Sequence, residues 1–96
     1  MLLHIFMRIS FDATKRDKTL AERGLDFDDA GKVFAGNHLI VADDRKEYGE
    51  PRFITIGHIA SRMVVIVWTQ RTGSRRIISM RKANEREQKI YAPYLA

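Results

Sequence analysis

The chain has no cysteine, so it can form neither a disulfide framework nor a metal site with thiolate ligands. It also has no membrane-spanning stretch, because its apolar segment Met63–Gln70 has the length of a strand, whereas a transmembrane helix needs ~20 residues. The apolar start, Met1–Met7, is too short for a secretory signal and contains no small-residue cleavage site. We therefore expect a cytoplasmic protein that does not act on membranes.

Familiar catalytic motifs are missing as well. The histidines His4, His38 and His58 have no partners at the i+3 or i+4 spacing that metal sites favour. The sequence contains no glycine-rich phosphate loop and suggests no Ser-His-Asp arrangement. The carboxylate pairs at 28–29 and 43–44 fit a helix N-terminus and a turn, respectively. We therefore expect no bound metal and no cofactor.

What the chain does have is an uneven distribution of charge. Its 96 residues suit one domain, in which residues 1–6 could be an extension ahead of a natural start at Met7. Residues 1–48 carry 8 Lys/Arg and 9 Asp/Glu, whereas residues 49–96 carry 9 Lys/Arg and 3 Asp/Glu. A basic half favours nucleic acid, an anionic membrane or an acidic protein as partner. An ordinary basic surface kept for solubility explains the charge equally well.

Hydrophobic patterns and turn residues predict an α+β fold. The expected elements are a strand at 5–11, helices at 13–23 and 26–34, strands at 38–44, 52–59, 63–71 and 75–81, and a last helix that ends at Pro93. Asp12 and Gly24 are of the types that begin and end a helix, and Asn84 with Glu87 forms a capping box. We expect a small antiparallel sheet, with an N-terminal helical hairpin and a C-terminal helix packed on one face.

Alternation along the last two strands places arginines on one face, which we expect to be the uncovered one. Arg75 and Arg81 share that face, and the hairpin turn brings Arg71 close to Arg75. Lys82 and Arg86 would extend the cationic surface. Arginine suits phosphate because its planar fork donates two hydrogen bonds and can stack on bases. The plainer alternative is a solvated face that happens to be rich in arginine.

A cationic surface of this kind could cleave RNA, because RNA carries its own nucleophile, the 2′-hydroxyl. The side chains that could move a proton are Glu85, Tyr91 and His58, and none is compelling from the sequence. Packing is the commoner role for His58, and anchoring a helix is the commoner role for Tyr91. Trp68 is also better explained as a core residue than as a platform for base stacking.

Four segments of the chain have the character of a known family: FDATKRDKTLAERGLDFDDAGKVF, DDRKEYGEPRFITIG, MVVIVWTQR and RRIISMRKANEREQKIY. Together they resemble the BrnT family, small bacterial ribonuclease toxins of type II toxin–antitoxin modules. The resemblance covers nearly everything from about Met7 to Tyr91. Its most specific parts are RFITIG, before the longest apolar strand, and the pattern RIISxRKAxxxE near the end.

The resemblance implies a RelE-like toxin fold and metal-independent endoribonuclease activity that arrests translation. It also implies a BrnA-type antitoxin, a DNA-binding protein through which the toxin reaches operator DNA. The catalytic candidates are Arg71, Arg81, Glu85 and Tyr91, and the RNA-binding candidates are Arg75, Lys82 and Arg86. A non-catalytic module that binds nucleic acid or protein through the same basic face is the alternative.

The chain departs from the family at the end of the first helix. Members commonly read N-x-x-K-H-G there, whereas Thr19, Glu22 and Arg23 replace the asparagine, lysine and histidine in this chain. Arginine stays charged and cannot replace histidine as a proton carrier. We therefore assign no catalytic role to the first helix.

Overall fold

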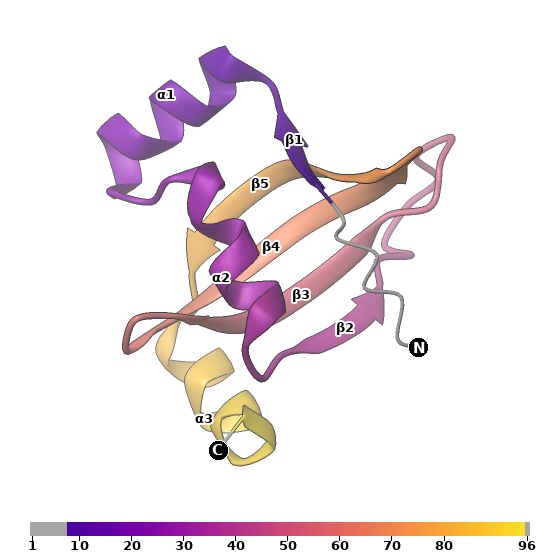
Figure 1. The fold of residues 1–96 in the computed structure, drawn as a ribbon. Helices are drawn as coiled ribbons and strands as arrows, with labels where there is room; N and C mark the ends of the chain where they lie inside the picture. Colours follow the sequence, from indigo (N-terminus) through magenta and orange to yellow (C-terminus); the bar gives the residue numbers. More distant parts are fainter. Residues whose placement is uncertain (1–7, 96) are drawn as a thin grey trace, which may run out of the picture.

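The computed structural model describes residues 8–95. The elements, in chain order, are β1 (Arg8–Phe11), α1 (Ala13–Arg23), the 3-10 turn η1 (Phe27–Asp29), α2 (Ala30–Ala35), β2 (Leu39–Ala42), β3 (Phe53–Ile59), β4 (Arg62–Arg71), β5 (Ser74–Lys82) and α3 (Glu85–Leu95) (Figure 1). The α+β class expected from the sequence is confirmed. The part of the first expected strand at 5–7 lies outside the described residues.

The five strands form one mixed sheet in the order β1-β5-β4-β3-β2 (Figure 1). Strands β2 to β5 are antiparallel neighbours. The short turns of the sequence predict this for β3, β4 and β5, whereas a longer loop joins β2 to β3. The expectation of a purely antiparallel sheet is wrong, because β1 pairs with β5 in parallel. The first strand thus lies beside the last one, an arrangement that no local pattern in the sequence specifies.

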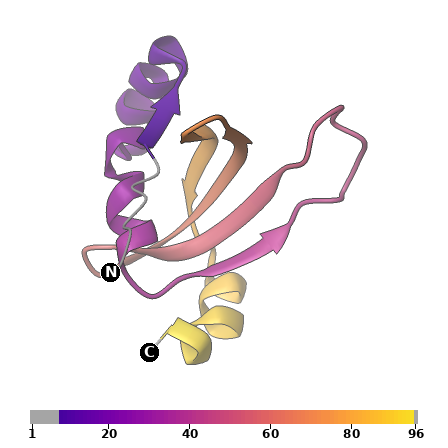
Figure 2. The same cartoon turned by 45° about the vertical axis from the view of Figure 1, so that its right-hand side comes forward.

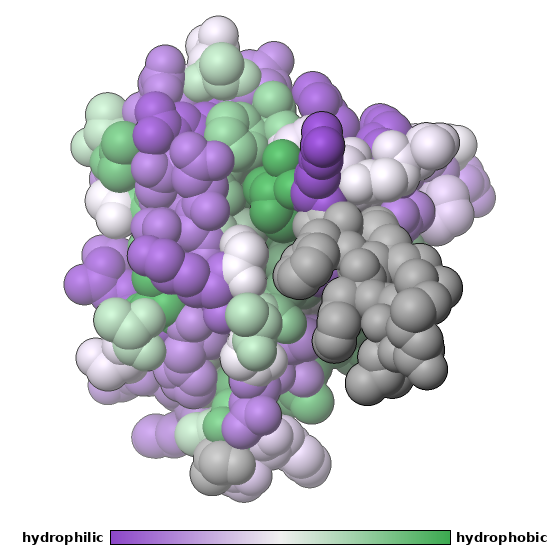
Figure 3. All heavy atoms as spheres, in the orientation of Figure 1, coloured by the Kyte–Doolittle hydropathy of each residue, from purple (hydrophilic) through white to green (hydrophobic). Residues whose placement is uncertain are grey.

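Helix α1 begins and ends where its capping residues predict. The Asp12 carboxylate accepts a hydrogen bond from the Lys15 amide at 3.0 Å, and Gly24 adopts a left-handed φ of 68° while donating to the Leu20 carbonyl. None of the α1 residues is buried. α1 therefore contributes little to the core, and the packing of this region depends on α2. Figure 3 shows that the outer surface on the α1 and α2 side is largely hydrophilic.

α2 and the turn before it cover one face of the sheet. The apolar cluster between them comprises Leu25, Phe27, Ala30, Val33, Val64, Ile66, Trp68, Ile77 and Met80. The helix comes very close to β3 at Gly57, where a Cβ atom would lie 2.6 Å from Val33 Cγ1. Glycine at this position is what permits the close packing of helix on strand. The expectation that Trp68 is a core residue is confirmed, since it is 5% exposed.

α3 packs on the opposite face, so the expectation that all helices share one face is wrong. Leu95 and Ala83 belong to a second apolar cluster with Ile56, Met63 and Val65. The reason lies in β4, which is apolar on both faces and needs a cover on each side. In Figure 2, α1 and α2 lie on one side of the sheet, and the loop between β2 and β3 projects away from them.

The capping box of α3 is confirmed. The Glu87 amide donates to Asn84 Oδ1 at 2.8 Å, and the Asn84 amide donates to Glu87 Oε1 at 2.9 Å. The predicted end of the helix at Pro93 is wrong, because α3 continues through Pro93 to Leu95. The last residue is buried in the second cluster, so packing extends the helix beyond the position that proline indicates.

Candidate functional site

A β-bulge in β5 decides which arginines share a face. Val67 pairs with Ser79, but the next residue, Trp68, pairs with Ile77, so Ile78 is the extra residue. The alternation of side chains therefore shifts between Ile77 and Ser79. Before the bulge, the odd-numbered residues of β5, such as Arg75 and Ile77, face α2. After the bulge, the even-numbered residues, such as Met80, face α2.

Arg75 consequently lies apart from Arg81, and the expectation that the two share a face is wrong. The Arg75 guanidinium stacks on the Phe34 ring at 4.0 Å and lies 5.1 Å from the Trp68 ring centroid. Its Nε is buried without a hydrogen-bond partner among residues 8–95. Burial lowers the pKa of this guanidinium from its usual value. These contacts make Arg75 part of the aromatic layer under α2.

Other arginines collect on the opposite side of the sheet. Trp68 faces α2, and side chains alternate along β4, so Thr69 and Arg71 face the other side. Arg76 pairs with Thr69 and therefore shares that side. Two arginines of the segment between β2 and β3 extend this side. We call this set the arginine face: Arg45, Arg52, Arg71, Arg76 and Arg81.

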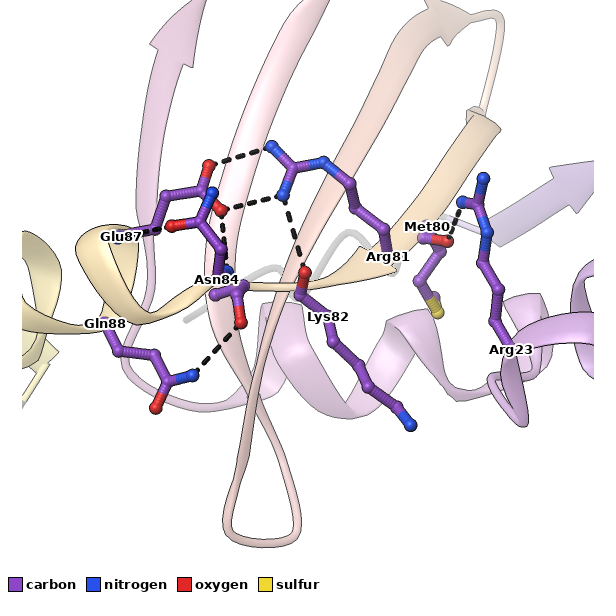
Figure 4. Close-up of polar contacts among 8 residues, drawn as sticks. Arg23, Met80, Arg81, Lys82, Asn84, Glu87 and Gln88 are labelled. Atoms are coloured by element: carbon purple, nitrogen blue, oxygen red, sulfur yellow. Dashed lines mark hydrogen bonds and ion pairs between the residues drawn. The ribbon is translucent and has the colours of Figure 1, made fainter.

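Arg81 is held by the carboxylate that caps α3. Its Nη1 and Nη2 donate to Glu87 Oε1 and Oε2 at 2.7 and 2.8 Å (Figure 4). The ion pair lowers the pKa of Glu87 to about 2 and raises the pKa of Arg81, while the nearby charge of Arg45 opposes the latter shift. The pair fixes the orientation of the guanidinium at the junction of β5 and α3.

Two further arginines of this face are also engaged. Arg71 Nη1 donates to Glu50 Oε2 at 2.7 Å, which ties the end of β4 to the loop between β2 and β3. Arg45 donates through Nε and Nη2 to the fully buried Asp43 carboxylate at 2.7 and 2.8 Å. This contact lowers the pKa of Asp43 to about 2. The guanidinium groups of Arg45, Arg71 and Arg81 are therefore not free, because a carboxylate offsets part of the charge of each.

The remaining candidates are dispersed. Lys82 opposes Val64, which belongs to the cluster under α2, and its side chain points away from Arg81 in Figure 4. Glu85 and Arg86 are exposed in the first turn of α3. Tyr91 is half-buried against the second apolar cluster, and its hydroxyl makes no hydrogen bond within the described part of the chain. The structure thus places Arg71 and Arg81 on one face, but at opposite ends of it, because Arg71 pairs with Ser74 whereas Arg81 pairs with Val65, six residues earlier in β4 and about 20 Å away. Arg75 and Lys82 lie on the other face.

Sequence reasoning missed three members of the arginine face. Arg76 was missed because simple alternation puts it on the face opposite to Arg81, and alternation cannot detect a bulge. Arg45 and Arg52 belong to a segment whose charge and Gly/Pro content indicate only an exposed loop. The sequence identified Glu87 as a helix cap but not as the partner of Arg81. The two residues are six positions apart, a spacing at which neither a helix nor a strand brings side chains together.

Arg23, at the position of the family's histidine, contacts the strand that carries Arg81. Its Nη1 donates to the Met80 carbonyl at 2.8 Å (Figure 4). The contact holds the end of α1 against the outer edge of β5, beyond the last residue that pairs with β1. The contact is structural in character and fixes α1, whose own side chains bury so little.

Two broader features complete the description of the site. Across residues 8–95, no three histidine, aspartate or glutamate side chains are arranged to hold a metal ion. In the same part of the chain, no helix is both long enough and apolar enough to cross a bilayer.

The sequence of this chain matches a family model over residues 11–87, which include the whole sheet except part of β1. The model describes the ribonuclease toxin BrnT of type II toxin–antitoxin systems. A comparison with curated proteins found no match. The match includes the apolar cluster under α2, the arginine face and the capping box of α3, and the chain therefore belongs to the BrnT family of ribonuclease toxins.

Proposed function

We propose that this protein is an endoribonuclease toxin of the cytoplasm that cleaves RNA without a metal and thereby arrests translation. The observation that carries the proposal is the arginine face, where Arg81 is fixed by Glu87 beside further guanidinium groups on one side of the sheet. A RelE-like fold and neutralisation by a BrnA-type antitoxin belong to the same proposal. The antitoxin would bind operator DNA and carry the toxin with it.

The chemistry follows from the substrate. The 2′-hydroxyl oxygen attacks the adjacent phosphorus while the bond to the 5′ oxygen breaks, which gives a 2′,3′-cyclic phosphate and a 5′-hydroxyl end. Negative charge grows on the phosphate oxygens during attack, and preorganised guanidinium groups stabilise it. Arg81 takes this role, while Arg71 and Arg76, farther along the same face, hold the RNA backbone.

The ion pairs do not prevent phosphate binding. A guanidinium has five N–H donors. Glu87 accepts from Nη1 and Nη2 of Arg81, and the Lys82 carbonyl accepts from Nη1 at 3.4 Å, so Nε–H and one N–H of Nη2 are left for the substrate. Glu87 lowers the net charge of the site but removes the entropy cost of ordering the arginine. Arg71 contacts Glu50 through Nη1 alone, and Nη1 also donates to the Gln70 carbonyl at 3.4 Å, so its Nε–H and Nη2 donors are left.

Two side chains are candidates for proton transfer. Tyr91 lies on the inner side of α3, and its hydroxyl has no hydrogen-bond partner in the described chain. Glu85 is exposed in the first turn of the same helix. One group must take the proton of the 2′-hydroxyl and another must give a proton to the 5′ oxygen. We assign these two roles to Tyr91 and Glu85 together and do not specify which residue takes which role. Arg86 and Lys82 then attract the RNA backbone from outside the arginine face.

Induced expression of the full chain, with growth and RNA integrity as readouts, tests the proposal. We expect growth arrest with fragmented transcripts for the native protein. Arg81→Lys keeps the charge but loses the planar fork, and should lower the cleavage rate by about 10²–10³-fold, as loss of an oxyanion donor does. Growth arrest with intact transcripts would contradict RNA cleavage.

The matched control separates chemistry from folding. Arg23→Lys weakens another arginine contact to β5 without touching the arginine face. It should stay fully toxic. If Arg81→Lys is as toxic as Arg23→Lys while both variants are folded by circular dichroism, Arg81 does not stabilise the reacting phosphate.

One observation favours a second candidate, a module that binds RNA without cleaving it. Arg81 and Arg71 are both engaged by carboxylates, and phosphate contacts give affinity without chemistry. A face that only binds would need no proton carriers. Binding to RNA with no fragments at any enzyme concentration would support this alternative.

A further inference from the structure

The segment between β2 and β3 encloses a hollow beside the arginine face. Its volume is about 410 Å³, and the residues from Ala42 to Phe53 line most of it. In Figure 2 this segment reaches away from α1 and α2, on the far side of the sheet from those helices. The mechanism above does not use this hollow.

The segment is held in a defined shape. The Asp43 carboxylate is fully buried and accepts two hydrogen bonds from the Arg45 side chain, one from the Arg45 amide and one from the Tyr48 hydroxyl at 3.3 Å. At its other end, Thr69 Oγ1 donates to the Pro51 carbonyl at 2.6 Å. The hollow is therefore preformed, which lowers the entropy cost of binding a small planar group.

An aromatic ring and a guanidinium form a flat platform in the hollow. Arg52 stacks on the Tyr48 ring, with the guanidinium carbon 4.1 Å from the ring centroid. The guanidinium makes no hydrogen bond within residues 8–95, and its Nε is buried without a partner. The flat face of such a stacked guanidinium is suited to a planar ligand that lies parallel to it.

The rim of the hollow supplies the complementary groups. Lys46 lies over the Tyr48 ring at 5.2 Å and adds a second donor, while Asp44 and Glu47 contribute carboxylates. Guanine is the base that presents acceptors at O6 and N7 and donors at N1 and N2. The Lys46 ammonium matches the first pair of atoms and a carboxylate matches the second. No other RNA base presents both the two acceptors and the two donors side by side.

The hollow adjoins the residues that act on the phosphate. Glu50 lines it and also holds Arg71 through the 2.7 Å ion pair. Arg45, which anchors the segment, is near enough to Arg81 for its charge to affect that guanidinium. A base in the hollow would thus belong to a nucleotide close to the one that is cleaved.

We propose that this hollow binds one unstacked guanine of the RNA substrate and so selects the cleavage position. The inference rests on the proposed ribonuclease function and adds a specificity site to it. The base stacks on the Tyr48–Arg52 pair, Lys46 donates to its O6 and N7, and Glu47 accepts from N1 and N2. The sites of cleavage should therefore carry guanine at one fixed position.

The test maps the 5′ ends of cellular RNA after induction of the full chain. The native protein should cut at positions with guanine at a fixed distance. Glu47→Gln should reduce the preference for guanine over adenine by roughly 5- to 150-fold, the value of one good bidentate base contact. Tyr48→Ala should reduce the cleavage rate at guanine sites by a similar factor through lost stacking.

Controls distinguish loss of recognition from loss of folding. Tyr48→Phe keeps the ring and removes only the hydroxyl bonded to Asp43, so it should keep the guanine preference. Glu22→Gln makes the same charge change as Glu47→Gln but on α1, and should leave both rate and preference unchanged. Thermal unfolding confirms that each variant is folded.

The outcomes separate the two proposals. If the native protein produces no new RNA ends, the ribonuclease function itself is refuted. If it cuts RNA without guanine at a fixed position, or if Glu47→Gln cuts with the native preference, the guanine site is refuted and the ribonuclease function stands. A preference for another base that Glu47→Gln does not alter likewise overturns the inference.

Discussion

Arg81 and Glu87 form a two-pronged ion pair that joins the end of β5 to the first turn of α3. One carboxylate oxygen also accepts the Asn84 amide, so a single side chain caps the helix and orients the arginine. The geometry of the helix cap and the orientation of Arg81 are therefore coupled. We infer that Glu87 is a positioning residue, which acts on the substrate only through Arg81.

The first prediction concerns this coupling. Glu87→Gln keeps a side chain that can complete the capping box but loses the ion pair, so it should destabilise the fold by only ~1 kcal/mol. Cleavage should fall more than stability does, because Arg81 is no longer held in place. The kinetic readout is a lower kcat with little change in KM. If Glu87→Gln is less stable than the native protein but keeps the native kcat, Glu87 has only a structural role.

The second prediction concerns acid. The ion pair lowers the folded-state pKa of Glu87 to about 2, whereas an unperturbed glutamate in the unfolded chain has a value of ~4.3. The native state therefore binds fewer protons. The stability from this pair is complete above ~pH 4.3 and is lost as the pH falls towards 2.

Urea unfolding of the native protein and of Glu87→Gln between pH 6 and pH 2.5 measures this effect. The difference in unfolding free energy between them should be constant from pH 6 to about pH 5 and should shrink below that. Asp43→Asn should show the same pattern through the pair with Arg45, because the pKa of Asp43 is also lowered to about 2. A difference that stays constant down to pH 2.5 contradicts the coupling.

The third prediction concerns the close contact of α2 with the sheet. A Cβ at Gly57 would lie 2.6 Å from Val33 Cγ1 and 3.3 Å from His38 Cβ, so Gly57→Ala must displace α2. We expect a loss of ~1–3 kcal/mol in unfolding free energy. Gly31→Ala is the control, since nothing lies within 4 Å of its Cβ and alanine favours a helix, so it should stabilise by up to ~1 kcal/mol. Equal stability of the two variants would refute the contact.

The fourth prediction uses two adjacent arginines on opposite faces. Arg76→Gln removes a cation from the arginine face, and Arg75→Gln removes one from the aromatic layer under α2. Binding of a single-stranded 2′-O-methyl RNA, which lacks the nucleophile, is measured at several salt concentrations. Arg76→Gln should reduce the slope of log affinity against log salt by about 0.7, the value for one phosphate contact to a single strand.

Arg75→Gln should leave that slope unchanged. It should instead lower the unfolding free energy by about 1 kcal/mol, because the stacking on Phe34 is lost. If the two substitutions changed the salt slope equally, RNA would contact both faces of the sheet, and the assignment of the arginine face would be wrong.

Much of the local structure followed from the sequence. Asp12 and Gly24 specified the ends of α1, and Asn84 with Glu87 specified the start of α3, because these residues satisfy backbone groups within a few positions of themselves. The family was also recognisable from four segments in order, and a family model matches residues 11–87.

The arrangement of the site required the tertiary structure. One extra residue in β5 moved Arg75 to the aromatic layer and Arg76 to the opposite face, and the bulge has no signal in the local pattern. The partner of Arg81 stands beyond the end of its strand, and the partner of Arg71 belongs to a distant loop. Capping depends on hydrogen bonds between near neighbours, which a sequence states directly. The face of a strand residue depends on strand register, and its ionic partner depends on which distant segment packs beside it. Only the folded sheet decides both.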